Sequence, residues 1–489
     1  MKLKNVLAYC LIKNTKMIQE LLEQDIQEIT QDTRQVKQGS LFIAIKGAHF
    51  DGHDLVAEAI KAGALAVVVE RVPEDTSLPF VLVSDTAKAA AQIANAFYQN
   101  PSGKLQVVGV TGTNGKTTIT HLVDQIASQL GRKTGIIGTM YNKVNQEVIP
   151  TVNTTPDSIT LQNLLSQMAV KEVDVAALEV SSHGLSLGRA WGVDFDVAAF
   201  TNLTQDHLDF HHTMEEYFYA KSLLFSQLGN TYSDKKKLAV INRDDTYGNR
   251  LVHMTSANVL TYGCQGKGDI QGSDIVITST GTQFKLRYQG EDYAIQTQLV
   301  GLFNVYNLLA VIGISIGLGY NLEEVIKIIP LIEPTSGRFQ LVDNAKKVAA
   351  VVDYAHTPDG LENVLETSQD ITDKHIYCVV GCGGDRDKTK RPIMADIAVK
   401  YADTAIFTSD NPRTEEPEAI LQDMVAHLEV TNYLVEVDRK KAIELALDMA
   451  EEGDLVLVAG KGHETYQIIG EEKSHFDDRE IISQYLVKE

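Results

Sequence analysis

The sequence lacks any apolar run as long as a membrane-spanning helix requires. Such a helix needs roughly 18–20 consecutive apolar residues, and every apolar segment of this 489-residue chain is shorter. The N-terminal segment is basic, keeps two lysines near its apolar stretch and has no small-residue cleavage site, so it does not resemble a signal peptide. We therefore expect a cytoplasmic protein with no membrane-inserted segment.

The chain also lacks an excess of positive charge and has few cysteines. Its 44 Lys and Arg residues are outnumbered by 65 Asp and Glu residues, which gives a formal charge of −21. This balance excludes a surface built to coat a nucleic-acid backbone, so anionic ligands would need helix N-termini, metals or single basic residues. Four cysteines are too few for a disulfide framework, and Cys378 and Cys382 lack the spacing of a zinc site. We expect buried thiols at these two positions.

Three stretches of the chain differ in pattern, and the chain length favours two to four domains. Residues 1–102 mix short predicted strands (40–45, 65–70 and 80–83) with helical segments and end at a proline. Residues 103–336 open with a strand, a glycine loop and a helix, and the alternating segment 269–298 predicts a small antiparallel addition. In residues 337–489, the segments KVAAVVDYAH, HIYCVVGCGG, TAIFTSDNPR and DLVLVAGKGHE alternate with helical patterns. We predict an α/β protein with a mostly parallel central sheet and a doubly wound, Rossmann-like C-terminal sheet.

The glycine-rich segment Thr111–Thr118 (TGTNGKTT) lies between a β-branched apolar segment and apolar residues at helical spacing. In such a loop, backbone N–H groups and a helix N-terminus can face a polyphosphate. Lys116 would add a positive charge and Thr117 a hydroxyl for Mg²⁺. The spacing departs from the common phosphate-loop pattern, because five residues separate Gly109 from Gly115. A plain glycine turn would explain the composition, but the Lys-Thr pair that opens the helix favours nucleotide binding.

Three further residues could form a metal site at this loop. Glu179 ends the apolar segment VDVAALE, His207 lies in NLTQDH after FDVAAF, and Lys221 lies in the helical segment EEYFYAKSLLF. Mg²⁺ prefers hard oxygen ligands, and an ATP-using enzyme needs it to neutralise phosphate charge. Taken singly, each residue has a simpler explanation, as a helix cap, a satisfied core histidine and a solvated lysine. Together they are a candidate metal site.

Six motifs in a fixed order carry a family resemblance. TGTNGKTT, LEVSSHGL, NLTQDHLDFH, GLFNVYNLLA, SGRFQ and DYAHTP follow one another along the chain. Their order and spacing resemble the Mur ligases of bacterial cell-wall synthesis, and the resemblance covers nearly the whole chain. It implies three domains: residues 1–102 for the UDP end of a substrate, 103–336 for ATP, and 337–489, a Rossmann-like domain, for an incoming amino acid.

The resemblance also implies roles for individual residues. The implied catalytic residues are Lys116, Glu179, His207 and Lys221. ATP would contact Gly112, Thr113, Asn114, Gly115, Lys116, Thr117, Thr118, Asn304, Arg338 and Asp353. Mg²⁺ would be held by Thr117, Glu179, His207 and Lys221, with the lysine converted to a carbamate. The UDP-sugar peptide would contact Thr33, Asn153, Thr154, Thr155, Ser181 and Arg189.

The C-terminal stretch bears on which amino acid is added. The motif DNPR (Asp410, Asn411 and Arg413 around a proline) matches the family members that add meso-diaminopimelate, and Arg391, Gly460 and Glu464 would complete the pocket. Diaminopimelate carries a second carboxylate, which an arginine can bind through two hydrogen bonds. L-Lysine has an ammonium group there, which Arg413 would repel. A plain turn at the Asn-Pro pair is the simpler explanation of the motif.

The resemblance implies an ATP-dependent amide ligase of peptidoglycan precursor synthesis. ATP would convert a carboxylate of UDP-N-acetylmuramoyl-L-alanyl-D-glutamate into an acyl phosphate, and the amine of meso-diaminopimelate would displace phosphate. The substrates would be small molecules, with no nucleic acid, and we expect a monomer. Alternatives are an L-lysine-adding ligase of the same step, a folylpolyglutamate-synthase-like ligase, and a nucleotide-binding regulator without catalysis.

Overall fold

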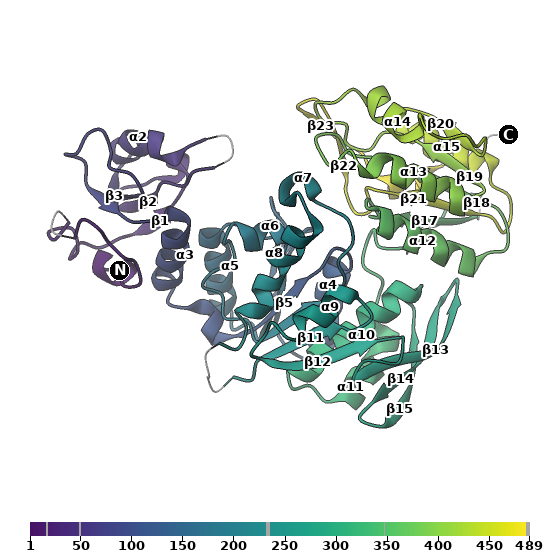
Figure 1. The fold of residues 1–489 in the computed structure, drawn as a ribbon, viewed down its shortest axis with the longest axis horizontal. Helices are drawn as coiled ribbons and strands as arrows, with labels where there is room; N and C mark the ends of the chain where they lie inside the picture. The colour runs from purple at the N-terminus through teal and green to yellow at the C-terminus, as the bar shows by residue number, and fades with distance from the viewer. Residues whose placement is uncertain (16–17, 48–49, 231–234, 347, 486–489) are drawn as a thin grey trace. The chain divides into compact units, whose positions relative to one another are not determined.

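The computed structural model describes residues 1–15, 18–47, 50–230, 235–346 and 348–485 (Figure 1). By their internal contacts the residues form two compact units that interleave along the chain. One unit contains 1–111, 130–198 and 230–237, and the other contains 112–129, 199–229 and 238–489. Each of the three larger sheets lies within one predicted domain range. Because the contact-based units do not follow those ranges, the division into three domains stays a prediction.

The first sheet has four parallel strands in chain order. They are β1 (Glu28–Thr30), β2 (Ser40–Ile43), β3 (Ala64–Val69) and β4 (Phe80–Leu82). Helix α1 (Leu3–Val6) precedes β1, α2 (Val56–Lys61) lies between β2 and β3, and α3 (Thr86–Phe97) follows β4. The Asp85 side chain caps α3 by accepting from the backbone N–H of Lys88. Helices α1 and α3 pack in one apolar cluster with this sheet and α2 packs in another, so both faces are covered. The three predicted strands are present, and the three-residue β1 was not predicted.

The largest sheet has eleven strands in the order β15-β14-β13-β12-β11-β10-β5-β9-β6-β7-β8. The strands are β5 (Gln106–Thr111), β6 (Thr134–Ile137), β7 (Asn142–Val144), β8 (Glu147–Ile149), β9 (Val175–Glu179), β10 (Val197–Phe200), β11 (Leu238–Asn242), β12 (Asn258–Gly263), β13 (Ile270–Thr278), β14 (Gly281–Tyr288) and β15 (Glu291–Thr297). Strands β6, β9 and β5 pair in parallel, as do β11, β12 and β13. Strands β13, β14 and β15 pair antiparallel, which confirms the predicted addition at 269–298.

The helices associated with this sheet follow the glycine loop and the other strand ends. They are α4 (Lys116–Gln129), α5 (Ser158–Val170), α6 (Ser182–Ser186), α7 (Leu208–His211), α8 (Met214–Ser226), α9 (Thr246–Leu251), α10 (Leu302–Gly317) and α11 (Leu322–Ile328). The apolar α10 packs against α4 and against strands β11, β12 and β13. Within the part of the chain that the structure describes, no helix combines the length and apolar character that crossing a bilayer requires.

The C-terminal sheet has six strands in the order β16-β17-β21-β18-β19-β20. They are β16 (Gln340–Leu341), β17 (Ala349–Asp353), β18 (Ile376–Val380), β19 (Thr404–Phe407), β20 (Tyr433–Val435) and β21 (Leu455–Ala459), and a separate hairpin contains β22 (Tyr466–Ile469) and β23 (Glu472–His475). All pairings in the sheet are parallel except that of β16 with β17. The four predicted segments supply β17, β18, β19 and β21, which confirms the Rossmann-like sheet.

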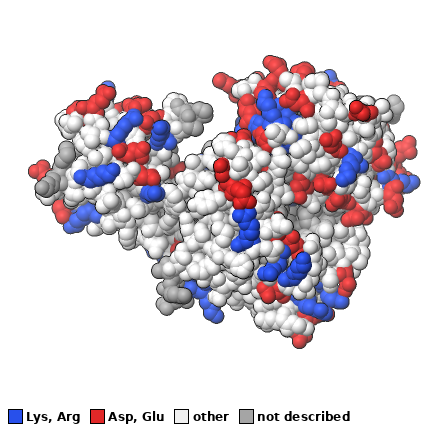
Figure 2. All heavy atoms as spheres, in the orientation of Figure 1, with Lys and Arg blue, Asp and Glu red and all other residues white. Residues whose placement is uncertain are grey.

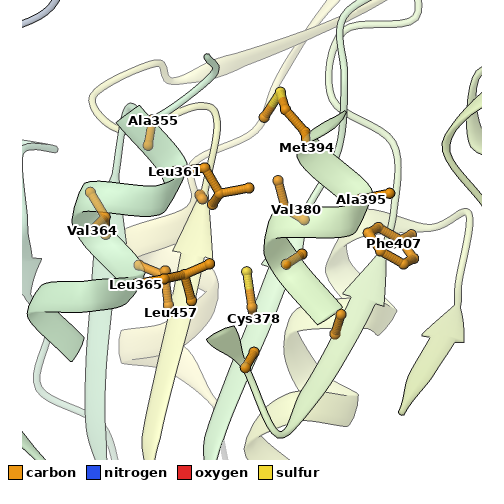
Figure 3. Close-up of a cluster of buried hydrophobic side chains, with 14 of the residues drawn as sticks. Ala355, Leu361, Val364, Leu365, Cys378, Val380, Met394, Ala395, Phe407 and Leu457 are labelled. Carbon is orange, nitrogen blue, oxygen red and sulfur yellow. The ribbon is translucent and has the colours of Figure 1, made fainter. Parts of the chain in front are cut away.

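Helices cover both faces of the C-terminal sheet, which explains why its strands are almost continuously apolar. On one face, α12 (Pro358–Ile371), α13 (Lys390–Tyr401) and α14 (Pro417–Val425) enclose a buried cluster. Figure 3 shows Leu361 and Leu365 of α12 and Met394 of α13 pointing toward Val380 and Leu457 of the strands. The other face is covered by α15 (Arg439–Met449) and α16 (Asp478–Gln484). Both Cys378 and Cys382 are buried and free, as expected.

The charged side chains are distributed as the acidic composition suggests. On the face drawn in Figure 2, the basic side chains of the described residues stand in small groups beside acidic ones. This distribution agrees with local recognition of anions and not with a broad basic surface.

Candidate functional site

The glycine loop has the geometry of a phosphate-binding loop. Strand β5 ends at Thr111 and α4 begins at Lys116, so the residues between them lead into a helix N-terminus. Gly112 and Gly115 have positive φ angles of 148° and 90°. A Cβ atom at Gly112 would lie 1.8 Å from Thr201 Oγ1, so no other residue fits there without rearrangement. Lys116 Nζ donates to the carbonyl oxygens of Gly112 and Thr113 at 2.9 and 2.8 Å.

The segment that follows β10 anchors this loop. The hydroxyl of Thr201 donates to the carbonyl oxygen of Asn114 at 2.6 Å, and the Asn114 N–H donates to Asn202 Oδ1 at 2.9 Å. Thr113 Oγ1 lies 3.2 Å from the Tyr217 hydroxyl of α8. The NLTQDH motif therefore holds the phosphate loop in shape in addition to carrying His207. Thr118 is buried in the first turn of α4.

Lys221 reaches the same loop from α8. Its side chain is 1% exposed, and Nζ donates to the Gly112 carbonyl oxygen at 2.8 Å. Nζ also lies 4.5 Å from the centre of the Tyr217 ring. Burial, and then the nearby Lys116 ammonium, lower the pKa of Lys221 well below its usual value. Among the described residues, Lys221 forms no ion pair with a carboxylate that would hold it in the charged form. Burial and this lack of an ion pair favour the neutral form of its amine.

His207 lies in the same compact unit, at the start of α7. It adopts a left-handed backbone conformation with φ of 55°, and its Nε2 lies 3.3 Å from Asp206 Oδ2. Burial alone would raise the pKa of Asp206, but His207, Lys390 and His356 outweigh it and lower that pKa to about 2. Asp206 therefore stays ionised and orients the imidazole.

Glu179 ends β9 in the other compact unit. Its carboxylate is buried and accepts hydrogen bonds from the Thr139 N–H at 2.9 Å and from the Thr139 hydroxyl at 3.0 Å. A Cβ atom at Gly138 would lie 2.4 Å from Glu179 Oε1, so the turn after β6 needs glycine to admit the carboxylate. Among the described residues, no three His, Cys, Asp or Glu side chains form a preformed metal cluster.

Most of the residues expected to contact the UDP-sugar peptide gather around the end of β9. Thr154 Oγ1 lies 3.0 Å from Thr139 Oγ1, and Thr155 donates to the Glu179 carbonyl oxygen at 2.9 Å. Ser181 donates its N–H to Thr155 Oγ1 at 2.9 Å, and Arg189 Nη1 donates to the Thr155 carbonyl oxygen at 3.0 Å.

The two remaining residues of this predicted set lie in exposed or separate elements. Asn153 is exposed on the segment between β8 and α5. Thr33 lies in a short 3₁₀ helix, η1 (Thr33–Gln35), which Asp32 caps after β1. Their predicted roles are not tested by these positions.

Arg338, Asp353 and Asn304, which the resemblance assigned to ATP, differ in their surroundings. Arg338 Nη2 donates to the Thr117 hydroxyl at 3.0 Å and its guanidinium lies 4.6 Å from the Tyr354 ring centre. Asp353 is buried and accepts from two backbone N–H groups, and burial raises its pKa although Arg338 opposes the rise. Asn304 is buried at the start of α10 and donates to the Val300 carbonyl oxygen at 2.8 Å.

Two loops of the C-terminal sheet meet at the predicted amino-acid residues. Asn411 Nδ2 donates to Glu464 Oε2 at 2.9 Å, and Lys461 Nζ donates to both Asn411 Oδ1 and Glu464 Oε2 at 3.1 and 3.0 Å. Gly460 has a positive φ of 113°, and a Cβ atom there would lie 2.7 Å from Asp410 Oδ2. The structure therefore brings the 410–413 and 460–464 loops into contact, as the predicted pocket requires.

Arg413 and Arg386 are neighbouring guanidinium groups, and neither forms an ion pair within 4.0 Å among the described residues. Arg413 Nη1 donates to the Gly384 carbonyl oxygen at 2.7 Å, and Arg386 Nη1 donates to that of Asp385 at 2.8 Å. A Cβ atom at Gly383 would lie 2.9 Å from Arg413 Nη1 and 4.0 Å from Arg386 Cγ. Partial desolvation and the Arg413 charge lower the pKa of Arg386. Asp209 and Asp385 oppose this shift from a longer range. Two neighbouring guanidinium groups can bind an anionic ligand such as a carboxylate.

Arg391 has different surroundings from those the sequence suggested. Its side chain is 1% exposed and donates to both oxygens of Glu415 at 2.9 and 3.0 Å and to Asp423 at 2.7 Å. Arg391 lies inside α13, whereas Arg386 lies in the loop after β18, at the sheet edge where ligands of α/β proteins bind. That loop position is the sequence signal that could have identified Arg386.

These features define an α/β protein with a glycine-rich loop at a helix N-terminus and a separate cluster of polar loops on its C-terminal sheet. The chain belongs to the Mur ligase family: it matches the Mur ligase family catalytic domain over residues 25–98, the Mur ligase middle domain over 110–315 and the Mur ligase glutamate ligase domain over 337–462. This result confirms the resemblance read from the sequence.

Individual relatives cover almost the whole chain. The UDP-N-acetylmuramoyl-L-alanyl-D-glutamate–2,6-diaminopimelate ligase of Bacillus cereus is 50% identical over 463 residues, 94% of each protein. The enzyme of the same name from Lactiplantibacillus plantarum is 51% identical over 464 residues, again 94% of each. A solved structure titled as this ligase is 32% identical, with a TM-score of 0.69, and covers 99% of this chain and 98% of its own.

The surroundings of Arg391 predict how stability depends on pH. Hydrogen bonds from Arg391 and Lys388 lower the pKa of Glu415 from 4.5 to about 2. A lowered folded-state pKa stabilises the fold above the unfolded pKa, and this stabilisation is lost as the pH falls toward 2. Glu415→Gln should therefore lower the free energy of unfolding at pH 7 by about 1.5–3 kcal/mol, and much less at pH 3. Urea unfolding at both pH values measures this, with the exposed Glu429→Gln as control; equal losses at both pH values would contradict it.

Proposed function

We propose that the chain is an ATP-dependent ligase that adds meso-2,6-diaminopimelate to UDP-N-acetylmuramoyl-L-alanyl-D-glutamate, releasing ADP and phosphate. Curated relatives at 50 and 51% identity carry the name of this activity over 94% of their length. The observation that carries the choice of amino acid is the pair of neighbouring guanidinium groups of Arg386 and Arg413, which form no ion pair among the described residues. Arg413 also contacts the carbonyl oxygen of Asn411. In this proposal the protein works in the cytoplasm as a monomer, with domains at 1–102, 103–336 and 337–489.

The phosphate loop fits ATP. Backbone N–H groups of the loop and the N-terminus of α4 favour phosphate oxygens, and Lys116 already lies over the loop through its two carbonyl contacts. Gly112, Thr113, Asn114, Gly115, Thr117 and Thr118 would surround the phosphates. Arg338, Asp353 and Asn304 would bind the rest of the nucleotide. The hydrogen bond of 3.0 Å from the Arg338 guanidinium to the Thr117 hydroxyl supports this role for Arg338.

The oxygen donors among the candidate ligands are of the kind that Mg²⁺ prefers, and Mg²⁺ would neutralise phosphate charge during transfer. The Thr117 hydroxyl, the Glu179 carboxylate and His207 are the candidate ligands. Lys221 would join them as a carbamate, because a neutral amine can add CO₂ with loss of one proton and then presents two oxygens that share one negative charge. The buried position of Lys221, its lowered pKa and its lack of an ion pair support this role.

The chain's residues would then serve two chemical steps. In the first, Lys116 and the α4 N-terminus stabilise charge on the transferring phosphoryl group while it moves to the substrate carboxylate. In the second, the neutral amine of the amino acid attacks the acyl phosphate, the C–N bond forms, the C–O bond breaks and phosphate leaves with the electron pair. Positioning of the two substrates supplies much of the rate.

The substrates would meet residues from different loops. Thr33 would contact the uridine end, and Asn153, Thr154, Thr155, Ser181 and Arg189 the peptide end of the UDP-sugar peptide. The gathering of four of these residues around the end of β9 supports this assignment. For the amino acid, Asp410, Asn411, Arg413, Gly460 and Glu464 keep their proposed roles, and Arg386 takes the contact first assigned to Arg391. Arg391 is instead assigned a structural role, because Glu415 and Asp423 already neutralise its charge.

The direct test is phosphate release from ATP and Mg²⁺ with UDP-N-acetylmuramoyl-L-alanyl-D-glutamate, comparing meso-diaminopimelate with L-lysine as acceptors. We expect release that requires all substrates and is faster with diaminopimelate. Lys116→Ala should abolish it, because the charge over the phosphates is lost. Preference for lysine would favour the alternative ligase, and release without any acceptor would contradict coupled ligation.

The paired arginines should separate amino-acid binding from nucleotide binding. Arg386→Ala and Arg413→Ala should each raise KM for meso-diaminopimelate by about 10- to 100-fold, as expected for loss of a charged hydrogen bond of roughly 1.5–3 kcal/mol, and leave KM for ATP nearly unchanged. Arg243→Ala, at an arginine distant in sequence from both loops, is the control. Equal changes in both KM values would exclude a substrate contact.

Lys221 can be tested by chemical rescue. Lys221→Ala removes the carbamate and should lower kcat by at least about 100-fold, the scale seen when one charge-stabilising group is lost. Acetate or formate should restore part of the activity, because a small carboxylate can occupy the cavity that the side chain leaves. If chloride restored activity as well as acetate did, the carbamate would be removed from the proposal. The same would follow if no carboxylic acid restored activity.

A further inference from the structure

An ion pair that is fully removed from solvent lies next to the amino-acid loops. Arg439, the first residue of α15, and Asp478, the first of α16, both have 0% side-chain exposure. Arg439 Nε lies 2.8 Å from Asp478 Oδ1 and Nη2 lies 2.7 Å from Oδ2, so the pair is bidentate. Removing two charges from water costs several kcal/mol per ion, and stability alone is therefore a weak reason for such a pair.

The same guanidinium contacts the backbone where the two loops begin. Arg439 Nη2 donates to the Ala459 carbonyl oxygen at 3.0 Å, and Nη1 donates to that of Ser409 at 3.4 Å. Ala459 directly precedes the 460–464 loop, and Ser409 directly precedes the 410–413 loop. One buried cation therefore joins the two segments that carry the proposed amino-acid contacts.

These two loops leave strands that are not neighbours. Strand β18 lies between β21 and β19, so their ends are roughly 9–10 Å apart and no ladder hydrogen bond joins them. Beyond the strand ends the loops touch, since a Cβ at Gly460 would lie 2.7 Å from Asp410 Oδ2. Lys461 also connects the loops, but through the side chains of Asn411 and Glu464 themselves. Arg439 is the group that joins their backbones.

Carboxylates of both loops, in addition to Asp478, stabilise the charged form of Arg439. Burial lowers the pKa of Arg439, but Asp478 outweighs burial and raises it, with further contributions from Asp410 and Glu464. The carboxylates of the two loops therefore lie close enough to respond to this cation. Loss of the cation would affect both loops together.

We infer that the Arg439–Asp478 pair is a positioning element of the amino-acid site, which sets the spacing between the 410–413 and 460–464 loops. It acts through the carbonyl groups of Ser409 and Ala459, and neither side chain can touch a substrate because both are buried. The inference rests on the proposed function, which makes these loops the amino-acid site. A displacement of about 1 Å at such a site can cost roughly 100-fold in rate.

The test replaces the pair without leaving a single buried charge. Arg439→Met combined with Asp478→Leu substitutes apolar side chains of similar size, a change that often leaves stability unaltered or improved. We expect a folded protein whose KM for meso-diaminopimelate rises by at least about tenfold, while KM for ATP and for the UDP-sugar dipeptide stay near wild-type values. The control is the exposed bidentate pair of Arg250 and Glu215, changed to glutamines, which should alter no KM.

The outcomes separate positioning from a structural role. An unchanged KM for meso-diaminopimelate in a folded double variant would overturn the inference, as would equal increases in all three KM values. If the double variant does not fold, Arg439→Lys replaces it: lysine can pair with Asp478 but has one nitrogen, so it cannot reach both carbonyls and the same selective rise is expected. A wild-type enzyme that releases no phosphate with meso-diaminopimelate would instead refute the proposed function.

Discussion

The carbonyl oxygen of Gly112 accepts hydrogen bonds from two lysines, and the proposed chemistry depends on this contact. Lys116 Nζ and Lys221 Nζ lie 2.9 and 2.8 Å from it. If both amines were protonated, they would lie within about 6 Å of each other and repel by roughly 3 kcal/mol at an effective dielectric of about 20. This repulsion, after burial, is a cause of the lowered pKa of Lys221. Phosphate groups, or a carbamate on Lys221, would add negative charge beside these two lysines.

This arrangement requires a loop that cannot relax away from the lysines. Thr201 and Asn202, which follow β10, bind both ends of the Asn114 peptide, and Gly112 lies so close to Thr201 that no side chain fits. The parallel strands bring these segments together, because their carboxyl ends share one edge of the sheet. The anchored loop therefore keeps the two lysine side chains close to each other.

Much of the fold could be predicted because buried parallel strands leave a plain pattern. Segments such as HIYCVVGCGG and DLVLVAGKGHE are apolar on both faces and end in polar loops, and they became β18 and β21. The alternating segment at 269–298 became the antiparallel strands β13, β14 and β15. Strands β1, β7 and β8 are among those that were not predicted, and their three residues are too few to show a periodicity. The longer strands β11 and β12 were not predicted either.

The sequence can indicate a candidate site when all of its residues lie in one short segment. It cannot do so when the role of a residue depends on side chains that are distant in the sequence. The phosphate loop contains its glycines, lysine and threonine within eight residues, so the sequence alone indicated it. The choice between Arg386 and Arg391 was harder, because both lie in GDRDKTKRP and only the distance from the preceding strand separates them. Glu415 and Asp423 neutralise Arg391 from the next loop and helix, whereas Arg386 forms no ion pair among the described residues. The function of a basic residue is decided by which carboxylates the fold places beside it, and only the tertiary structure shows that.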